Sequence, residues 1–386
     1  MKRISIAPRD NWQHTVASQG LTYHTDPDGY PYWNESAYYE FTSDEVDVLY
    51  DATVELYERC LDAAKYVIEG NRLGQIGLPV EAHDAIRWSW QNRERSLYGR
   101  FDLAYNGIDP PKMLEFNADT PTSLVEGAVA QWYWLQDRFP KSDQFNTIWE
   151  ELVAAWQLMK AEGAIMGHTV YFATCRSEED WMTITMLQET AHEAGLATKT
   201  IHMDEIGWDP RQRVFVDLES NTIQSIFKLY PWEWLLKDQF GSQAIESVKI
   251  MQWIEPIWKF VLSCKGILPV LWELFPDHPN LLPCYADGPR DMPRYVSKPI
   301  ISREGQNVSI HTPMSTTDSE GRYGGYPRIF QQLFDLPSFD GGHPVIGSWI
   351  VGGKACGMGV RESQGLITDN GSFYLPHLFN HVSSGL

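Results

Sequence analysis

Residues 97–123 read Leu-Tyr-Gly-Arg-Phe-Asp-Leu-Ala-Tyr-Asn-Gly-Ile-Asp-Pro-Pro-Lys-Met-Leu-Glu-Phe-Asn-Ala-Asp-Thr-Pro-Thr-Ser. A turn cluster at 106–111 separates two runs in which apolar and polar residues alternate, which indicates two antiparallel strands. Alternation predicts an apolar face of Phe101, Leu103, Leu114, Phe116 and Ala118, and a polar face of Arg100, Asp102, Glu115, Asn117 and Asp119. If Tyr105 pairs with Lys112, Asp102 lies opposite Glu115 and Arg100 lies opposite Asn117.

The polar face of this hairpin carries two carboxylates that directly oppose each other. Like charges in that position are destabilising, so Asp102 and Glu115 favour a cation between them. Carboxylate and amide oxygens suit Mg²⁺, which often shares its ligand shell with substrate phosphates. Arg100 is a fixed planar charge, suited to a phosphate or a developing oxyanion. The alternative is an ordinary solvated face whose charges pair with one another.

Length and composition restrict the function classes. The chain has 386 residues, enough for two or three domains, and a formal net charge of −20, which disfavours nucleic acid or an anionic membrane as partner. Five scattered cysteines without Cys-x-x-Cys spacing indicate reduced thiols, and residues 1–10 have no signal-peptide pattern, so we expect a cytoplasmic protein. The P-loop and dinucleotide-binding glycine fingerprints are missing from the sequence.

Taken in order, the chain predicts an α+β fold in three parts. Residues 1–165 are expected to hold helices, including a capped one from Thr42–Glu45 to Gly70, together with the hairpin. Residues 166–220 predict a small βαβ domain, with strands at 169–174 and 197–203. Residues 221–386 predict a helical segment over 222–275, then strand-rich lobes with an edge strand at 328–334 and final strands at 345–351, 355–361 and 365–368.

Two further segments admit a functional and a plain structural interpretation. Lys298 is the one lysine of a strand predicted at 295–301, and the loop Ser302–Asn307 follows it. Backbone N–H groups in such a loop can cover phosphates, although most such loops are surface hairpins. Glu178 and Glu179 open the helix of the βαβ unit. Their negative charges stabilise the helix by interacting with the positive end of its dipole, or they form a carboxylate cluster beside the carboxyl edge of the sheet, where ligands often bind.

Six ordered blocks of the chain resemble the synthetase half of bacterial glutathionylspermidine synthases and their shorter acid–amine ligase relatives. The blocks are Tyr98–Asp102, Leu114–Ser123, Phe227–Glu233, Lys265–Trp272, Lys298–Val308 and Gly359–Glu362. The resemblance covers nearly the whole chain and begins almost at residue 1, so we expect no amidase domain. It implies an ATP-grasp-like ligase with two lobes around ATP, and a small βαβ (pre-ATP-grasp) domain.

The resemblance also implies site residues, position by position. Asp102, Glu115 and Asn117 match magnesium ligands, and Arg100 matches the catalytic arginine that stabilises the transferring phosphoryl group. The expected ATP contacts are Lys265, Lys298, Ser302, Arg303, Glu304, Gly305, Asn307, Gln331, Gln332, Leu333, Phe334 and Arg361. The expected substrate contacts are Thr120, Thr122, Glu178, Glu179 and Leu229. Leu229 replaces a threonine that contacts glutathione in the full synthetases, so the acid substrate is expected to differ from glutathione. A glutamine of the family's nucleotide pocket falls near Val345 in this sequence.

These observations predict an ATP- and Mg²⁺-dependent carboxylate–amine ligase that works through an acyl phosphate. Its partners would be a small-molecule acid, with a peptide-like acid as one option, and an amine, with a polyamine as one option. A non-catalytic nucleotide- or peptide-binding relative is the second hypothesis, and a carbohydrate-binding module, suggested only by 16 tryptophans, is the third. The sequence leaves the oligomeric state open.

Overall fold

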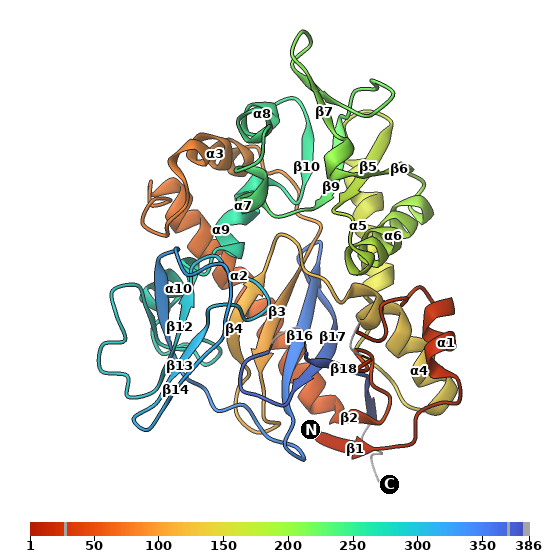
Figure 1. Cartoon of the computed structure of the whole chain (residues 1–386), viewed down its shortest axis with the longest axis vertical. Coiled ribbons are helices and arrows are strands. Elements are labelled where there is room, and N and C mark those ends of the chain that lie inside the picture. The colour runs from red at the N-terminus through yellow and green to blue at the C-terminus, as the bar shows by residue number, and fades with distance from the viewer. Residues whose placement is uncertain (27–28, 369–370, 381–386) are drawn as a thin grey trace.

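A five-stranded antiparallel sheet lies at the centre of the molecule, in the order β18-β17-β16-β3-β4. The computed structural model describes residues 1–26, 29–368 and 371–380. The strands of this central sheet are β3 (Tyr98–Ala104), β4 (Lys112–Asn117), β16 (His343–Val351), β17 (Lys354–Ser363) and β18 (Phe373–Leu375). Two segments far apart in the sequence therefore share one sheet, and β3 is hydrogen-bonded between β4 and β16 (Figure 1).

The hairpin of β3 and β4 forms with the predicted pairing on its functional side. Asp102 lies opposite Glu115 and Arg100 lies opposite Asn117. The pairing of Tyr105 with Lys112 is wrong, because Ala104 is the partner of Lys112 and a β-bulge at Leu114 absorbs the difference. Leu114 consequently leaves the apolar face, and Met113 is buried in the core instead.

One long helix, α2 (Ser43–Glu69), covers the back of the central sheet (Figure 1). It begins as predicted, with a capping box in which Thr42 accepts from the N–H of Glu45 and the Glu45 side chain accepts from the N–H of Thr42. Its Thr53 hydroxyl lies 2.6 Å from the Ser348 hydroxyl of β16. The apolar face of the hairpin is closed by the stacked rings of Phe101 and Phe116, whose centroids are 4.0 Å apart.

A second, parallel sheet has the order β10-β9-β5-β6 and will be called the small sheet. The predicted βαβ unit is present as β5 (Thr169–Thr174), α6 (Glu178–Glu193) and β6 (Ala197–His202). The helical prediction for 222–275 is wrong in two places, because β9 (Ser225–Leu229) and β10 (Gln252–Ile254) extend this sheet beyond residue 220. Only the short helices α7 (Trp232–Leu235), α8 (Gly241–Ser247), α9 (Phe260–Ser263) and α10 (Ile267–Leu274) lie in that segment, besides the 3-10 turn Ile257–Lys259.

A third sheet has the order β11-β15-β12-β13-β14. Its strands are β11 (Cys284–Tyr285), β12 (Tyr295–Pro299), β13 (Ser309–His311), β14 (Thr316–Asp318) and β15 (Arg328–Gln332). The prediction of an edge strand at 328–334 is wrong, since β15 pairs with both β11 and β12. The strand predicted at 365–368 is also wrong, because no strand runs through those residues and the neighbour of β17 is β18.

The remaining elements surround these sheets. They are β1 (Lys2–Ser5), β2 (Ala37–Thr42) and β19 (His377–Asn380) in one sheet, the pair β7 (Gly207–Asp209) and β8 (Val214–Val216), and the helices α1 (Trp12–Ser18), α3 (His83–Gln91), α4 (Gln131–Arg138) and α5 (Ile148–Ala161). A π-helical turn at Glu126–Ala130 directly precedes α4. All five cysteines are free thiols. Among the described residues, none of the helices has the length and apolar character needed to span a bilayer.

We expect Phe101→Ala to cost about 3–5 kcal/mol of unfolding free energy, because it removes half of the buried stack behind the hairpin and leaves a cavity. Urea unfolding followed by fluorescence measures the loss. Ile108→Ala is the matched control in the hairpin loop, where the side chain is 89% exposed, and should change stability by less than about 0.5 kcal/mol. Equal losses in both variants would contradict this account of the core.

Candidate active site

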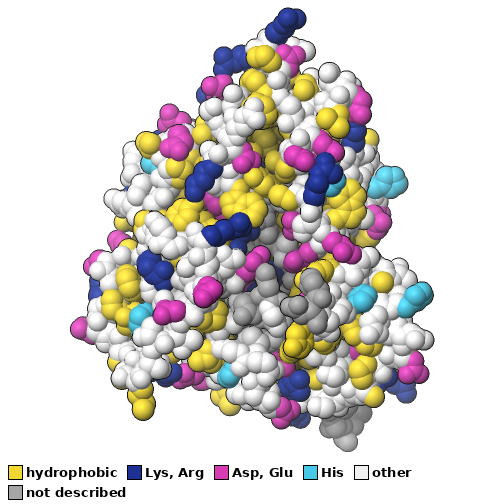
Figure 2. Space-filling model, viewed as in Figure 1, with side chains coloured by type: hydrophobic (Ala, Val, Ile, Leu, Met, Phe, Trp, Pro, Cys, Tyr) yellow, Lys and Arg dark blue, Asp and Glu magenta, His cyan; other side chains and the backbone are white. Residues whose placement is uncertain are grey.

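The polar face of the hairpin forms one wall of a cavity of about 350 Å³. The other walls come from β12 and β15 of the third sheet, from the carboxyl end of β9 and from the first turn of α6. Figure 2 shows the molecule from the side of Figure 1, hollowed near its middle, with basic and acidic side chains around the hollow. Of the predicted site residues, the lining includes Arg100, Asp102, Glu115, Asn117, Thr120, Thr122, Glu179, Leu229, Lys265, Lys298, Ser302, Arg303, Glu304, Gly305, Gln331, Gln332, Leu333, Phe334 and Arg361.

Asp102 lies at the centre of a group of donors on the central sheet. The Arg100 Nε is 2.9 Å from one carboxylate oxygen, and the Arg361 Nη2 is 2.9 Å from the other. Asn117 donates its side-chain amide to the same carboxylate at 3.2 Å. Arg100 also donates to the carbonyl oxygen of Thr122 at 2.6 Å, which holds the guanidinium at the edge of the cavity.

Glu115 is placed between two lysines that arrive from other parts of the chain. The Lys265 Nζ lies 3.2 Å from the Glu115 carboxylate and donates to the carbonyl oxygen of Ser302 at 2.8 Å. Burial alone would raise the pKa of Glu115, but the charges of Lys265 and Lys298 outweigh it and lower this pKa to about 2. The carboxylate therefore stays ionised throughout the physiological range.

The β-bulge at Leu114 joins the hairpin to the third sheet. The Lys298 Nζ donates to the Leu114 carbonyl oxygen at 3.1 Å and to the Gln331 side chain at 2.8 Å. Gln331 in turn donates to the carbonyl oxygen of Met113 at 3.2 Å. Residues of the cavity thus bind two carbonyl groups of β4, the edge strand of the central sheet, at the bulge and next to it. Burial lowers the pKa of Lys298, and the charge of Glu115 opposes this shift.

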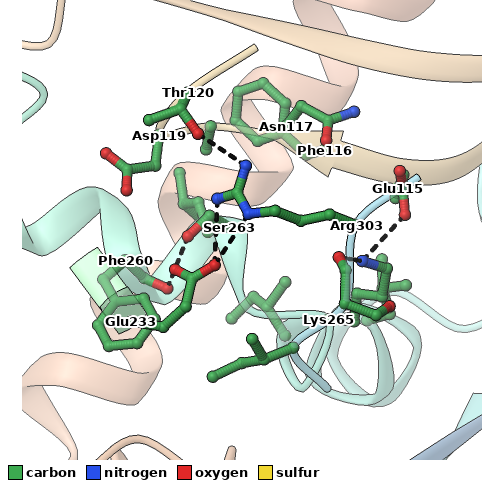
Figure 3. Close-up of a pocket in the computed structure, with 16 residues that line it drawn as sticks. Glu115, Phe116, Asn117, Asp119, Thr120, Glu233, Phe260, Ser263, Lys265 and Arg303 are labelled. Atoms are coloured by element: carbon green, nitrogen blue, oxygen red, sulfur yellow. Dashed lines mark hydrogen bonds and ion pairs between the residues drawn. The ribbon is translucent and has the colours of Figure 1, made fainter. Parts of the chain in front are cut away.

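A deeper pocket of about 40 Å³ continues from the cavity beneath β4 (Figure 3). Arg303 reaches across it, donating to the Glu233 carboxylate at 3.1 Å and to the Thr120 hydroxyl at 2.9 Å, while Lys265 points to Glu115. Glu233 was not predicted as a site residue from the sequence, and it lies in the segment 222–275 that was predicted to be helical. It stands at the start of α7, directly after Trp232.

The loop that follows β12 has backbone conformations that suit close contact with a ligand. Glu304, Gly305 and Asn307 all have positive φ angles, of 54°, 66° and 55°. Asn307 does not line the cavity, contrary to expectation. Its side-chain oxygen accepts from the Tyr323 N–H at 2.7 Å and its carbonyl from Arg328 at 2.9 Å, so it shapes the loop from behind.

The first turn of α6 brings two carboxyl groups to the cavity, but not the predicted pair. Glu178 is exposed and lies outside the lining, whereas Glu179 and Asp180 line it. Burial, followed by the charge of Glu126, raises the pKa of Glu179 to about 7. Burial raises the pKa of Asp180 to about 6, against the opposing charge of Arg303. The Ser177 hydroxyl caps the helix through the Asp180 N–H, so capping and site placement occur together.

An apolar and aromatic wall lies close to this acidic end. Leu229, Pro231 and Trp234 line it, and the Arg303 guanidinium lies 5.5 Å from the Trp234 ring. Tyr23 and Tyr32 also line the cavity and were missed. They belong to an irregular, aromatic-rich segment whose sequence gives no period from which a contact could be inferred.

The residues that are present fit a magnesium ion. Asp102, Glu115 and Asn117 offer two carboxylates and one amide oxygen from adjacent strands. Within the described residues there is no cluster of three or more His, Cys, Asp or Glu side chains of the kind that forms an all-protein metal cage. Mg²⁺ needs no such cage, because one or two carboxylates, waters and substrate phosphates usually complete its shell.

A protein-family model and several known proteins are similar to this chain. A protein-family model described as "Glutathionylspermidine synthase preATP-grasp" matches residues 3–380. The chain is 38% identical over 394 residues to a protein of Haemophilus influenzae named "Putative acid--amine ligase", covering 98% of this chain and 100% of the relative. It is 26% identical over 363 residues to the "Bifunctional glutathionylspermidine synthetase/amidase" of Escherichia coli K12, covering 86% of this chain but only 57% of the relative.

A solved structure of similar fold is a glutathione synthetase-like effector, GSS30, from Globodera pallida. It superposes with a TM-score of 0.59 at 12% identity, covering 96% of this chain and 95% of the effector. This likeness concerns the fold alone, and it confirms the expected mixture of helices and sheets. The named relatives are ligases, so the prediction of an enzyme of that class is confirmed. The match over residues 3–380 shows that the chain belongs to the glutathionylspermidine synthase preATP-grasp family.

Proposed function

We propose that the protein is an ATP- and Mg²⁺-dependent carboxylate–amine ligase with an ATP-grasp-like site between two lobes. One observation carries this proposal: a single cavity has four basic side chains around the Asp102–Glu115 pair at one end and the carboxyl groups of Glu179 and Asp180 at the other. The first end suits the phosphates of ATP, and the second end suits an ammonium group.

The proposed reaction has two balanced steps. An oxygen of the acid's carboxylate attacks the γ-phosphorus of ATP, ADP leaves, and an acyl phosphate forms. The neutral amine nitrogen then attacks the acyl carbon, inorganic phosphate leaves, and the amine proton is released as the amide forms. Such phosphoryl transfer depends mainly on positioning and on stabilising charge.

Each wall of the cavity has a role in these steps. Lys265 and Lys298 would place point charges beside the phosphates, and the Ser302–Gly305 loop would contribute backbone N–H groups. Arg100 would stabilise the transferring phosphoryl group and the oxyanion, because Asp102 and the Thr122 carbonyl fix its guanidinium. Asp102, Glu115 and Asn117 would hold Mg²⁺, which when bound neutralises phosphate charge.

The substrates are proposed from the acidic end and the apolar wall. Glu179 and Asp180 would bind the amine, for which a polyamine is one option that the name of the E. coli relative supports. The acid would lie against Leu229, Pro231 and Trp234, with Thr120 and Thr122 nearby. A peptide-like acid fits this wall, and Leu229 there favours one with an apolar group at that position over an acid that needs a hydroxyl partner.

The first test is calorimetric titration with a non-hydrolysable ATP analogue, with and without Mg²⁺. We expect binding that Mg²⁺ strengthens at least about tenfold, since the metal links the analogue's phosphates to the hairpin carboxylates. Failure of a folded sample to bind the analogue under either condition would contradict the proposal and favour a non-catalytic relative that binds another partner.

Glu115→Gln should abolish the Mg²⁺-dependent part of this binding while leaving the fold intact, because the amide keeps the shape but removes the charge held between the two lysines. Titration and circular dichroism measure the two effects. Glu58→Gln, on the exposed side of α2, is the matched control and should bind like the wild type. Unchanged Mg²⁺ dependence in Glu115→Gln would remove Glu115 from the metal site.

Binding of an amine should strengthen as pH rises. Glu179 and Asp180 have pKa values raised to about 7 and about 6, so both are largely protonated at pH 5.5 and largely ionised at pH 7.5. With spermidine as probe and the ATP analogue present, we expect the affinity measured by calorimetry to rise roughly tenfold over this range.

Glu179→Gln should flatten this pH profile, whereas Glu178→Gln should not, because the neighbouring Glu178 side chain is exposed outside the cavity. A profile that stays steep in Glu179→Gln, or that flattens equally in both variants, would contradict the assignment of Glu179. Lack of spermidine binding at every pH would contradict a polyamine as the amine.

A further inference from the structure

Two fully buried ion pairs flank the hairpin, outside the contacts that the proposed reaction uses. Lys228 lies 2.7 Å from Asp119, with side-chain exposures of 0% and 1%. Lys259 lies 3.5 Å from Glu255, and both side chains are 0% exposed. None of these four residues lines the main cavity, and of the four only Asp119 lines the adjoining pocket of about 40 Å³. Lys228 is part of the small-sheet strand β9, and Lys259 follows the small-sheet strand β10. Each pair also forms hydrogen bonds at one end of the hairpin.

The Asp119–Lys228 pair joins the end of the hairpin to β9. Asp119 follows β4 directly before Thr120, and Lys228 precedes Leu229, so each member is one residue from a cavity wall. The second carboxylate oxygen of Asp119 accepts from the Trp232 N–H at 2.9 Å. The carboxylate thus binds both the C-terminal end of β9 and the first residue of α7.

The Glu255–Lys259 pair holds the start of β3. One Glu255 oxygen accepts from the N–H groups of Leu97 and Tyr98, at 2.9 and 3.0 Å. Lys259 donates to the Ser96 hydroxyl at 2.7 Å and to the Tyr98 carbonyl at 3.0 Å. Tyr98 is two residues before Arg100, so these bonds fix the strand that carries Arg100 and Asp102.

Trp232 connects the two pairs. Its backbone N–H donates to Asp119, and its indole N–H donates to the backbone carbonyl of Glu255 at 3.1 Å. The result is a continuous polar path, through Lys228, Asp119, Trp232, Glu255 and Lys259, that runs from β9 to both arms of the hairpin.

Stability alone is a weak reason for such pairs. Removing two charges from water is costly, and apolar residues of similar volume often replace a buried ion pair without loss of stability. What an ion pair adds is a fixed geometry, because any displacement leaves two buried charges less well paired. That property matters where distances of a few tenths of an ångström decide ligand binding.

We propose that Asp119, Lys228, Glu255 and Lys259 are positioning residues that fix the phosphate end of the cavity against its acid- and amine-binding end. The inference rests on the proposed function for the assignment of those two ends. Movement of β9, which carries Leu229, would be passed through the pairs to the strands that carry Arg100, Asp102 and Glu115.

The test uses double variants that remove both charges of a pair and keep its hydrogen-bonding oxygen. These are Asp119→Asn with Lys228→Met, and Glu255→Gln with Lys259→Met. In the second, the amide oxygen can still accept from the Leu97 and Tyr98 N–H groups. The matched control, Lys199→Met with Asp217→Asn, removes the 2.7 Å ion pair between a small-sheet strand and the segment after β8, away from the hairpin.

Two readouts separate positioning from a purely structural role. In both hairpin-flanking variants we expect the Mg²⁺-dependent gain in affinity for the ATP analogue to fall about tenfold, with the control unchanged. We also expect faster amide hydrogen exchange over 97–104 and 112–117 than in the control at equal melting temperature.

The outcomes are distinct. The inference would be overturned if both double variants fold and keep the wild-type Mg²⁺-dependent gain in affinity. It would also be overturned if the control variant loses as much of this gain as they do. A wild-type protein that does not bind the analogue would contradict the proposed function itself. Hydrogen exchange would then still decide whether the pairs hold the hairpin, and unchanged exchange would overturn that part as well. If a double variant does not fold, Lys228→Arg and Lys259→Arg keep the charge while shifting its position, and the same two readouts apply.

Discussion

Asp102 and Glu115 face each other across neighbouring strands, and their mutual repulsion is the constraint that organises the rest of the site. Four cations oppose it: Arg100 lies on the same strand as Asp102, and three come from distant segments, Arg361 of β17, Lys265 of the turn before α10 and Lys298 of β12. Arg361, Lys265 and Lys298 reach the hairpin only when their own elements are folded beside it. The hairpin is therefore linked to β17, to the turn before α10 and to the third sheet through one electrostatic requirement.

The hairpin could be predicted from sequence because strict alternation and a strong turn cluster leave few options. The predicted pairing of Asp102 with Glu115 is correct although the assumed pairing at the turn is wrong by one residue. The two agree because the bulge at Leu114 inserts one residue into β4. The sequence contains no local mark of that bulge. At the bulge, Lys298 and Gln331 bind the carbonyl groups of Leu114 and Met113 from 184 and 218 positions away. Contacts between residues so far apart cannot be seen in a local pattern.

The same reasoning explains what the sequence left undetermined elsewhere. Strand β9 falls in a segment predicted to be helical, because a strand buried on both faces does not alternate, and its one charge, Lys228, is neutralised only by Asp119 from the end of the hairpin. At the start of α6, a capping pattern locates the helix but not its rotation, and the rotation decides that Glu179 rather than Glu178 enters the cavity. Of the residues expected to contact ATP, all but Asn307 line one cavity, because resemblance over six ordered blocks carries tertiary information that periodicity does not.

The bulge also separates a part of the hairpin whose strand pairing is fixed from a loop whose length can vary. On one side of Leu114 the pairing of Glu115 and Asn117 is fixed by the site, and on the other side lies an exposed loop with Ile108 at its tip. An extra residue in β4 is already accommodated there without disturbing the carboxylates. Natural lengthening or shortening of the 105–111 loop can therefore be absorbed at the bulge, so this edge of the protein is free to diverge in length while the chemistry beside it stays in register.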